Sequence, residues 1–410
     1  MHLSPEEQTW LNGDAGPALR RAMEIVVALG NIYGAERLIP VESVQISGVS
    51  YRNIGAAGLD FLRRWADEGA HVRVHTTLNP TAMDMRDWRI QGFAPDFAAQ
   101  QQAVIAAFAQ MGIHGSPPHA GDITPTCTPY LIGNRPRVGA HIAWAESSAV
   151  SFANSVLGAR TNREGGPGAI AAALTGRTGD YGLHLDINRQ ATLRVITTTQ
   201  PHSISDYSAL GALVGKTARK AVPYFETLSL TPTTPQWEEK LKALGAAMAA
   251  TGAVALYHVA GLTPEAQHTA PLAPHYDTVT LHDFTPGYAH LSDPIDTVDL
   301  VWIGCPHASL TEIAHVADIL RGKTLHRPLW ITCARPVQTA AEAAGLTATI
   351  TAAGGRLLAD ACMAIAPVRD LGFRAVATPS AKGAYYLRNL ARVAVRFAPL
   401  ETCIALAGGQ

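Results

Sequence analysis

Cysteine is scarce in this chain of 410 residues, which has five, at positions 127, 305, 333, 362 and 403. The number is odd, the spacings are irregular and no C-x-x-C motif occurs, unlike the paired disulfide framework of a small secreted fold. We therefore expect reduced thiols. If these cysteines bind a metal, the ligands must converge from distant parts of the sequence, which spacing alone does not demonstrate.

Long apolar runs and strong charge are missing as well. No stretch has 18 uninterrupted apolar residues, and the N-terminus has neither a basic nor an apolar leader region, so membrane insertion and export lack support. Charged residues make up 16% of the chain, the formal net charge is -1, and the basic runs are short, such as Arg63-Arg64. A basic face for nucleic acid is therefore not expected. These absences predict a cytoplasmic protein that binds neither membrane nor nucleic acid.

The length and a hydrophobic content of 47% predict large buried cores in more than one domain. Ser4, Pro5 and Glu7 form the pattern of a capping box at the start of a first helix. A run of turn residues at 231–235 predicts a boundary near residue 230. We thus expect an N-terminal α/β region over 1–230, itself divided into two domains, and a C-terminal α/β domain over 231–410.

Short apolar stretches alternate with helical patterns after the boundary, which is the rhythm of a parallel sheet. The predicted strands are 254–259, 298–303, 329–332 and 357–361, and the predicted helices are 309–321 and 337–345. Before the boundary, 41–46 and 71–75 alternate like strands and lead into polar loops. In parallel sheets ligands bind beyond the carboxyl ends of the strands, where Cys305, Cys333 and Cys362 lie. We expect an α/β fold with parallel-rich sheets around a central cleft.

Polar and reactive residues are concentrated between Cys127 and Arg189, within otherwise apolar sequence. Buried polar groups must be satisfied by one another or by a ligand, and the density here favours a ligand. His141 and Glu146 are five residues apart on an expected helix, so they do not form a metal pair by spacing, and we expect one of them to face the site.

Several long motifs resemble the large catalytic component of aconitase X. They run in the expected order from near the N-terminus to about residue 403: ISGVSY (46–51), CTPYL (127–131), HIAWAESSA (141–149), FANSVLGARTNREGG (152–166), IGCPH (303–307), DACM (360–363) and ATPSAK (377–382). The resemblance implies an aconitase-like hydro-lyase with three α/β domains in this chain. It also implies a separate small swivelling-domain subunit, because the sequence stops at 410.

The same resemblance implies an iron–sulfur cluster, either [4Fe-4S] or [2Fe-2S], held by Cys127, Cys305 and Cys362. Cys333 and Cys403 lie outside the motifs, and we expect them to be small buried residues. The base of the reaction is implied to be a serine of the small subunit. His307, two residues after Cys305, is a candidate for a residue that contacts and orients the metal ligands without binding the metal itself.

Dehydration beside a carboxylate needs a base, stabilisation of negative charge and help for the departing hydroxide. Arg163 is the main candidate for the substrate carboxylate, because a guanidinium offers two parallel donors, with an ordinary ion pair to Glu164 as the alternative. Lys382 is a candidate catalytic contact or proton donor. Arg160 and Arg189 are weaker candidates. The further substrate-binding candidates share a place in these polar motifs and are Thr161, Asn154, Ser47, Thr77 and Ser380.

Three functions stay open at this point. Overall resemblance to alanine-rich bacterial members favours dehydration of cis-3-hydroxy-L-proline to Δ1-pyrroline-2-carboxylate. Mevalonate 5-phosphate is the alternative small hydroxy acid, although no phosphate cradle stands out in the sequence. The third reading is an inactive scaffold that binds a metal cluster, against which the retention of all three motif cysteines argues.

Overall fold

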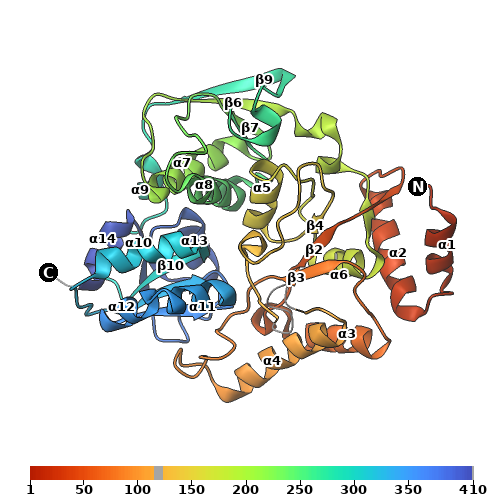
Figure 1. Cartoon of the computed structure of the whole chain (residues 1–410), viewed down its shortest axis with the longest axis horizontal. Helices are drawn as coiled ribbons and strands as arrows, with labels where there is room; N and C mark the ends of the chain where they lie inside the picture. Colours follow the sequence, from red (N-terminus) through yellow and green to blue (C-terminus); the bar gives the residue numbers. More distant parts are fainter. Residues whose placement is uncertain (115–122, 409–410) are drawn as a thin grey trace.

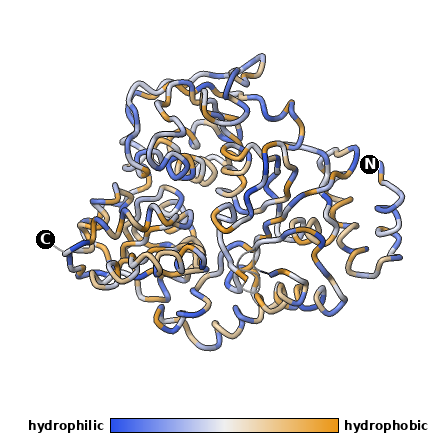
Figure 2. The backbone as a smooth tube through the Cα atoms, viewed as in Figure 1, coloured by the Kyte–Doolittle hydropathy of each residue, from blue (hydrophilic) through white to orange (hydrophobic). Residues whose placement is uncertain are grey.

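The computed structural model describes residues 1–114 and 123–408. Its elements form three groups, which Figure 1 shows in red to yellow, in green and in blue along the chain. Figure 2 shows apolar residues concentrated on the packed elements inside these groups, with polar residues on the outer turns. None of the described helices is both long and apolar enough to cross a bilayer.

The first group is built on a parallel sheet in the order β3-β2-β4, formed by β2 (Ser43–Ile46), β3 (His75–Leu78) and β4 (Ala143–Trp144). A small antiparallel pair, β1 (Leu38–Pro40) and β5 (Arg177–Gly179), lies beside it. The helices of this group are α1 (Pro5–Asn12), α2 (Pro17–Ile32), α3 (Tyr51–Asp67), α4 (Pro95–Gln110) and α6 (Gly166–Thr175). Helix α5 (Ser147–Ser155) follows β4 in the chain but shares the hydrophobic core of the second group. The capping box predicted at Ser4 and Glu7 is confirmed.

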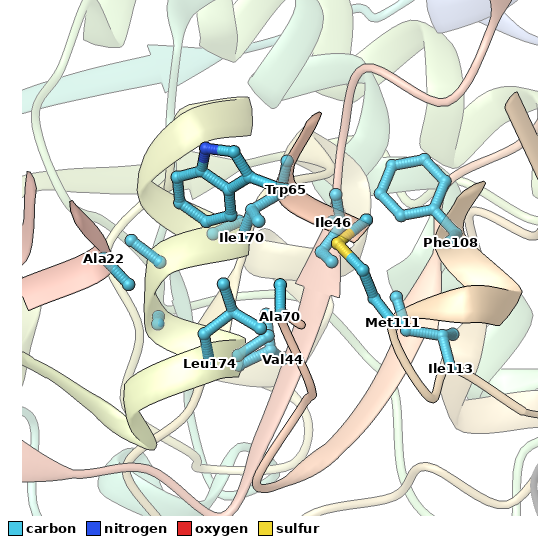
Figure 3. Packing of buried hydrophobic residues seen from close by; sticks show 14 of the residues in the cluster. Ala22, Val44, Ile46, Trp65, Ala70, Phe108, Met111, Ile113, Ile170 and Leu174 are labelled. Carbon is cyan, nitrogen blue, oxygen red and sulfur yellow. The ribbon is translucent and has the colours of Figure 1, made fainter. Parts of the chain in front are cut away.

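Large side chains from these helices bury the sheet. Trp65 of α3 and Phe108 of α4 are fully buried, together with Ile46 of β2 (Figure 3). Replacing an aromatic residue at such a site by alanine costs roughly 3–5 kcal/mol of stability, because the cavity left behind is not refilled. This core therefore fixes the strands whose carboxyl ends carry the polar motifs.

Two local predictions in this group are wrong. The strand expected at 71–75 lies instead at His75–Leu78, because pairing of His75 with Ser43 and of Leu78 with Ile46 brings Thr76 and Thr77 into the ladder. The helix on which His141 and Glu146 were expected begins only at Ser147, since β4 occupies Ala143–Trp144. Glu146 is consequently the N-cap residue of α5, where its side chain accepts from the backbone N–H of Ala149.

The second group has a parallel sheet in the order β8-β7-β6-β9: β6 (Ala191–Thr197), β7 (Pro223–Phe225), β8 (His258–Val259) and β9 (Leu272–Leu281). It takes strands from both sides of the turn-rich segment 231–235. Its helices are α7 (Ile204–Ala218), α8 (Trp237–Gly252) and α9 (Pro286–His290). Helix α8 packs closely on α7 and α5 and also contacts α13 (Ala381–Tyr386), a helix of the third group.

The third group is a five-stranded parallel sheet in the order β12-β11-β10-β13-β14. Its strands are β10 (Leu300–Ala308), β11 (Leu329–Cys333), β12 (Gly355–Ala359), β13 (Ala375–Thr378) and β14 (Ala394–Phe397). The helices are α10 (Leu310–Leu320), α11 (Arg335–Ala343), α12 (Leu346–Ala352), α13 (Ala381–Tyr386) and α14 (Leu400–Gly408). The parallel sheets and helices confirm the predicted α/β class, and Ser309 caps α10 as expected.

Strand β10 is longer than the predicted 298–303 because it continues through an irregular stretch that carries Cys305. Its register against β11 shifts between Ile303 and Ala308. Gly304 has φ of 97°, and a Cβ there would lie 2.2 Å from the carbonyl oxygen of Thr332, so only glycine fits. The irregularity directs Cys305 and His307 away from regular pairing.

Candidate active site

A cavity of about 300 Å³ lies between the first and third groups. It is bounded by residues that follow the carboxyl ends of parallel strands: Ser47 follows β2, Cys362 follows β12 and Lys382 follows β13. The position agrees with the general place of ligands in open parallel sheets. Two further predicted residues, Cys127 and Arg163, are also part of its lining.

The three motif cysteines lie close together, with Cys127 and Cys362 on the lining of this cavity and Cys305 on the lining of a second one. The thiols of Cys305 and Cys362 form a hydrogen bond, which lowers the pKa of Cys362 and raises that of Cys305. Burial is the main cause that raises the pKa of Cys127, whose Sγ accepts the backbone N–H of His307 at 3.2 Å. The other two cysteines, Cys333 and Cys403, are fully buried in a hydrophobic core.

Three unpaired thiols lie close together here, with those of Cys127 and Cys362 on the cavity lining, and thiolates are the groups that hold an iron–sulfur cluster. Among residues 1–114 and 123–408, no three His, Cys, Asp or Glu side chains are arranged to hold one metal ion. The ammonium of Lys382 favours the thiolate form of all three, against the effect of burial.

Lys382 and Glu146 form a buried ion pair across the cavity, from α13 to the start of α5. Lys382 Nζ also donates to Ser148 Oγ at 2.9 Å, and Glu146 Oε2 accepts the N–H of Ala149 at 2.8 Å. Burial alone raises the pKa of Glu146, but the interactions with Lys382 and Ser148 outweigh it and the pKa lies below its ordinary value. Burial opposes the charge of Lys382, yet Glu146 raises its pKa, so both groups are ionised.

Arg163 is exposed on the cavity lining, and no ion pair to it is present in the described part of the chain. The alternative partner Glu164 is buried and accepts a hydrogen bond from Thr178 Oγ1 at 3.2 Å. Burial raises the pKa of Glu164. The loop after Arg163 passes close to β2, since a Cβ on Gly166 would lie 3.2 Å from the carbonyl oxygen of Ser47. A free guanidinium beside this close approach suits an anionic ligand.

Other candidates lie outside the cavity lining. Asn154 is buried and fixes the backbone of Thr161, in the loop before Arg163. Its Nδ2 donates to the carbonyl of Thr161 at 2.9 Å, and its Oδ1 accepts the N–H of Thr161 at 3.0 Å. Thr77 accepts a hydrogen bond from Asn134 Nδ2 at 3.3 Å in the sheet interior. Ser380 caps α13 through the N–H of Gly383 at 3.0 Å.

The weaker arginine candidates are engaged elsewhere. Arg160 pairs with Asp186, and the fully buried Arg189 pairs with Glu265. Of the pair His141 and Glu146, only Glu146 reaches the cavity, since His141 Nδ1 lies 2.9 Å from Nδ1 of His184.

The sequence did not single out Glu146 as the partner of Lys382. Their positions are far apart in the chain, and Glu146 was expected on the same helix as His141. The available signal was a carboxylate directly before two serines at the end of a buried apolar stretch, which is an N-cap pattern that ends a strand and begins a helix.

The segment that carries Cys362 is held by a buried charge network. Arg335 Nη2 donates to Asp84 at 2.7 Å and pairs with Asp360, whose φ is 63°. The backbone N–H of Cys362 donates to the carbonyl of Thr81 at 3.0 Å. Burial is the main cause that raises the pKa of Asp360 to about 6. The loop after β3 thereby fixes the loop after β12, and the two groups meet at the cavity.

Comparison with known proteins agrees with this geometry. The models for the aconitase X first, second and third domains match residues 1–187, 191–285 and 298–409. The chain is 48% identical to the phosphomevalonate dehydratase large subunit of Methanothermobacter thermautotrophicus, over 95% of this chain and 94% of that protein. It is 45% identical to the one from Methanocaldococcus jannaschii, over 98% of both.

Two further relatives complete the picture. The chain is 39% identical to the cis-3-hydroxy-L-proline dehydratase of Pseudomonas aeruginosa, over 98% of this chain and 69% of that protein. The crystal structure of Thermococcus kodakaraensis aconitase X in its holo-form superposes with a TM-score of 0.90 at 45% identity, covering 99% of this chain and 100% of the other.

Proposed function

Because the chain belongs to the aconitase X family and is therefore a hydro-lyase, we propose that it is the large subunit of a phosphomevalonate dehydratase. The observation that carries the proposal is the identity of 45% and 48%, over nearly the whole of both chains, to large subunits of that name. The preference for cis-3-hydroxy-L-proline drawn from the sequence has weaker support, at 39% identity.

The proposed substrate, mevalonate 5-phosphate, is a β-hydroxy carboxylate with a phosphate at its other end. In the reaction a C–H bond next to the carboxylate breaks, the C–O bond of the neighbouring carbon breaks, and a C=C bond forms. The proton and the hydroxide leave together as water. The site must therefore bind one or two anionic groups, take up a proton and assist a departing hydroxide.

Arg163 binds an anionic end of the substrate in this proposal. Its guanidinium is exposed to the cavity without a carboxylate partner in the described chain, and the fork of N–H donors matches a carboxylate or a phosphate. The buried pair of Lys382 and Glu146 supplies a second, fixed donor. An ammonium has three N–H groups, two of which are used by Glu146 and Ser148, so the third is free to donate into the cavity.

Cys127, Cys305 and Cys362 would hold the iron–sulfur cluster, whether [4Fe-4S] or [2Fe-2S], and when bound it supplies an iron with a free coordination position that polarises the leaving hydroxyl. Among this chain's own residues, the ammonium of Lys382 opposes the rise in thiol pKa that burial causes, while its ion-pair partner Glu146 acts in the opposite direction on Cys127 and Cys362.

A small subunit completes the site in this proposal, because the relatives are named large subunits. The carboxylates on the cavity lining are poorly suited to be the base. Glu146 is paired with Lys382, and Glu164 is buried against Thr178. We accordingly assign proton removal to the small subunit, with a serine as the residue implied by the family resemblance.

The test is to co-express the chain with its small subunit under anaerobic conditions and to measure turnover of both substrates by mass spectrometry. We expect kcat/KM for mevalonate 5-phosphate to exceed that for cis-3-hydroxy-L-proline by about 10³-fold or more, the scale of several kcal/mol of differential transition-state binding. A preference for hydroxyproline would overturn the substrate assignment. If the cluster is present and neither substrate reacts, the inactive scaffold is the better description.

A further inference from the structure

Three cysteine-bearing segments meet on one side chain, that of His307, which is fully buried. Its Nδ1 lies 2.9 Å from Thr126 Oγ1, next to Cys127 in the chain. Its Nε2 lies 2.7 Å from the carbonyl oxygen of Ala361, next to Cys362. The residue itself follows Cys305 by two positions in β10. A single imidazole therefore spans the segments of all three thiols.

The hydrogen bonds determine which ring nitrogen of His307 carries the hydrogen. The carbonyl of Ala361 can only accept, so Nε2 carries the hydrogen and Nδ1 accepts from the hydroxyl of Thr126. The backbone N–H of His307 donates to Cys127 Sγ at 3.2 Å, and its carbonyl accepts from Lys242 Nζ at 3.0 Å. Every polar group of His307 is thus engaged, and the rigid ring sets the separation of the two segments on either side of it.

We propose that His307 is a positioning residue that holds the three thiols of Cys127, Cys305 and Cys362 at fixed distances from one another. The identity of the group that these thiols bind rests on the proposed function, but the placement of the thiols does not. His307 does not line the cavity, so its effect on the reaction passes through the cysteines. Residues behind metal ligands commonly act in this way.

The chain provides internal controls for a positioning role. Cys333 and Cys403 lie in the third group, as His307 does, and are fully buried in its hydrophobic core. His258 is a matched control for the histidine: it is also buried, and its Nε2 lies 2.8 Å from the carbonyl oxygen of Arg189, in the second group. Loss of general stability affects all buried cysteines, whereas loss of positioning affects only those next to His307.

The first experiment uses the metal-free full-length chain and a pulse of iodoacetamide, with alkylation of each cysteine quantified by mass spectrometry. In His307→Ala we expect Cys127, Cys305 and Cys362 to react about 10-fold faster or more, with Cys333 and Cys403 close to wild type, because only local opening is changed. His307→Gln keeps a donor for Ala361 and should recover part of the protection. His258→Ala should not accelerate Cys127, Cys305 and Cys362 selectively. Equal acceleration of all buried cysteines, or none, would overturn the proposal.

The second experiment reconstitutes the same variants with iron and sulfide and follows loss of visible absorption under a chelator. Cluster loss from His307→Ala should be about 10–100-fold faster than from wild type, as for other residues behind metal ligands. Loss at the wild-type rate overturns the positioning role. If wild type takes up no cluster while the alkylation pattern is as expected, the proposed cofactor fails and the placement of the thiols by His307 stands.

Discussion

The two sides of the cavity are built differently. The first-domain side, with Ser47, Cys127 and Arg163, rests on strands of two to four residues and places an exposed guanidinium in the cavity. The third-domain side, with Cys362 and Lys382, rests on a five-stranded sheet, and its groups are bound by buried partners. The contrast separates a side whose polar groups are held by buried partners, with Cys362 and Lys382, from a side that presents the exposed Arg163 to the cavity and also carries Cys127. The following predictions test that division.

The largest effect is expected from Cys305→Ser in the third domain. Loss of one thiolate should remove the visible absorption of the cluster and lower kcat/KM by about 10³-fold or more, since metal assistance is worth several kcal/mol in the transition state. Absorption spectra, iron content and turnover check this. Cys333→Ser and Cys403→Ser are the controls, and both should retain the cluster. An active enzyme without its cluster would contradict the iron mechanism.

Lys382→Met tests the buried ion pair. It leaves Glu146 ionised without its partner, and the free energy of unfolding of the metal-free chain should fall by about 3–5 kcal/mol, measured by urea denaturation. Adding Glu146→Gln to the same chain should restore much of this stability but not the activity, because the donor to the cavity stays missing. If the double variant is no more stable than Lys382→Met, the pair is not the cause of the loss.

Arg163→Ala tests the side that presents the exposed guanidinium to the cavity. We expect KM to rise about 10–100-fold, the equivalent of about 1.5–3 kcal/mol for hydrogen bonds to a charged group. The free energy of unfolding should change by less than about 0.5 kcal/mol, because the side chain is exposed and unpaired in the described chain. The KM of Arg163→Lys should lie between those of wild type and Arg163→Ala, since lysine keeps the positive charge but lacks the two parallel N–H donors. Unchanged kinetics in Arg163→Ala would remove this residue from substrate binding.

The smallest effect concerns the first domain away from the cavity, at the buried His184, whose Nδ1 lies 2.9 Å from that of the partly buried His141. Burial is the main cause that lowers the pKa of His184 to about 3, while the unfolded value is about 6.5. The unfolded chain therefore binds the proton first, and stability is lost as pH falls below about 6.5. Between pH 7 and 5 this group lowers the free energy of unfolding by about 2 kcal/mol. Urea titrations at both pH values should show a smaller loss in His184→Gln, and an equal loss would contradict the assignment.

The sequence predicts the third group better than the first. The apolar runs at 329–332 and 357–361 and the capping pattern at Ser309 correspond closely to β11, β12 and α10, because strands buried on both faces are continuous apolar runs. In the first group the strands are short and partly polar. Their position depends on the partner strand, as the pairing of His75 with Ser43 shows. The local pattern of apolar residues does not indicate which strand that partner is.

The site shows the same limit. Cys127, Cys362, Arg163, Ser47 and Lys382 were expected from motifs, and the cavity brings them together. The contact of Lys382 with Glu146 was not expected, because it joins residues far apart in the sequence and depends on how two domains pack. Thr161 and Asn154 share a motif with Arg163, yet they support its loop from inside. A motif identifies which residues belong together without stating which of them face the ligand.

The distribution of the three thiols along the chain also constrains how the protein is made. Cys127 lies in the first third of the sequence and Cys362 near its end, and they meet only when the loops after β3 and β12 are joined through Thr81 and Arg335. In the proposed cluster site the last thiol emerges from the ribosome only after most of the polypeptide has been made. Loading of that site would therefore follow synthesis and domain docking. Before docking, the three thiols lack the native packing that buries them and are open to oxidation.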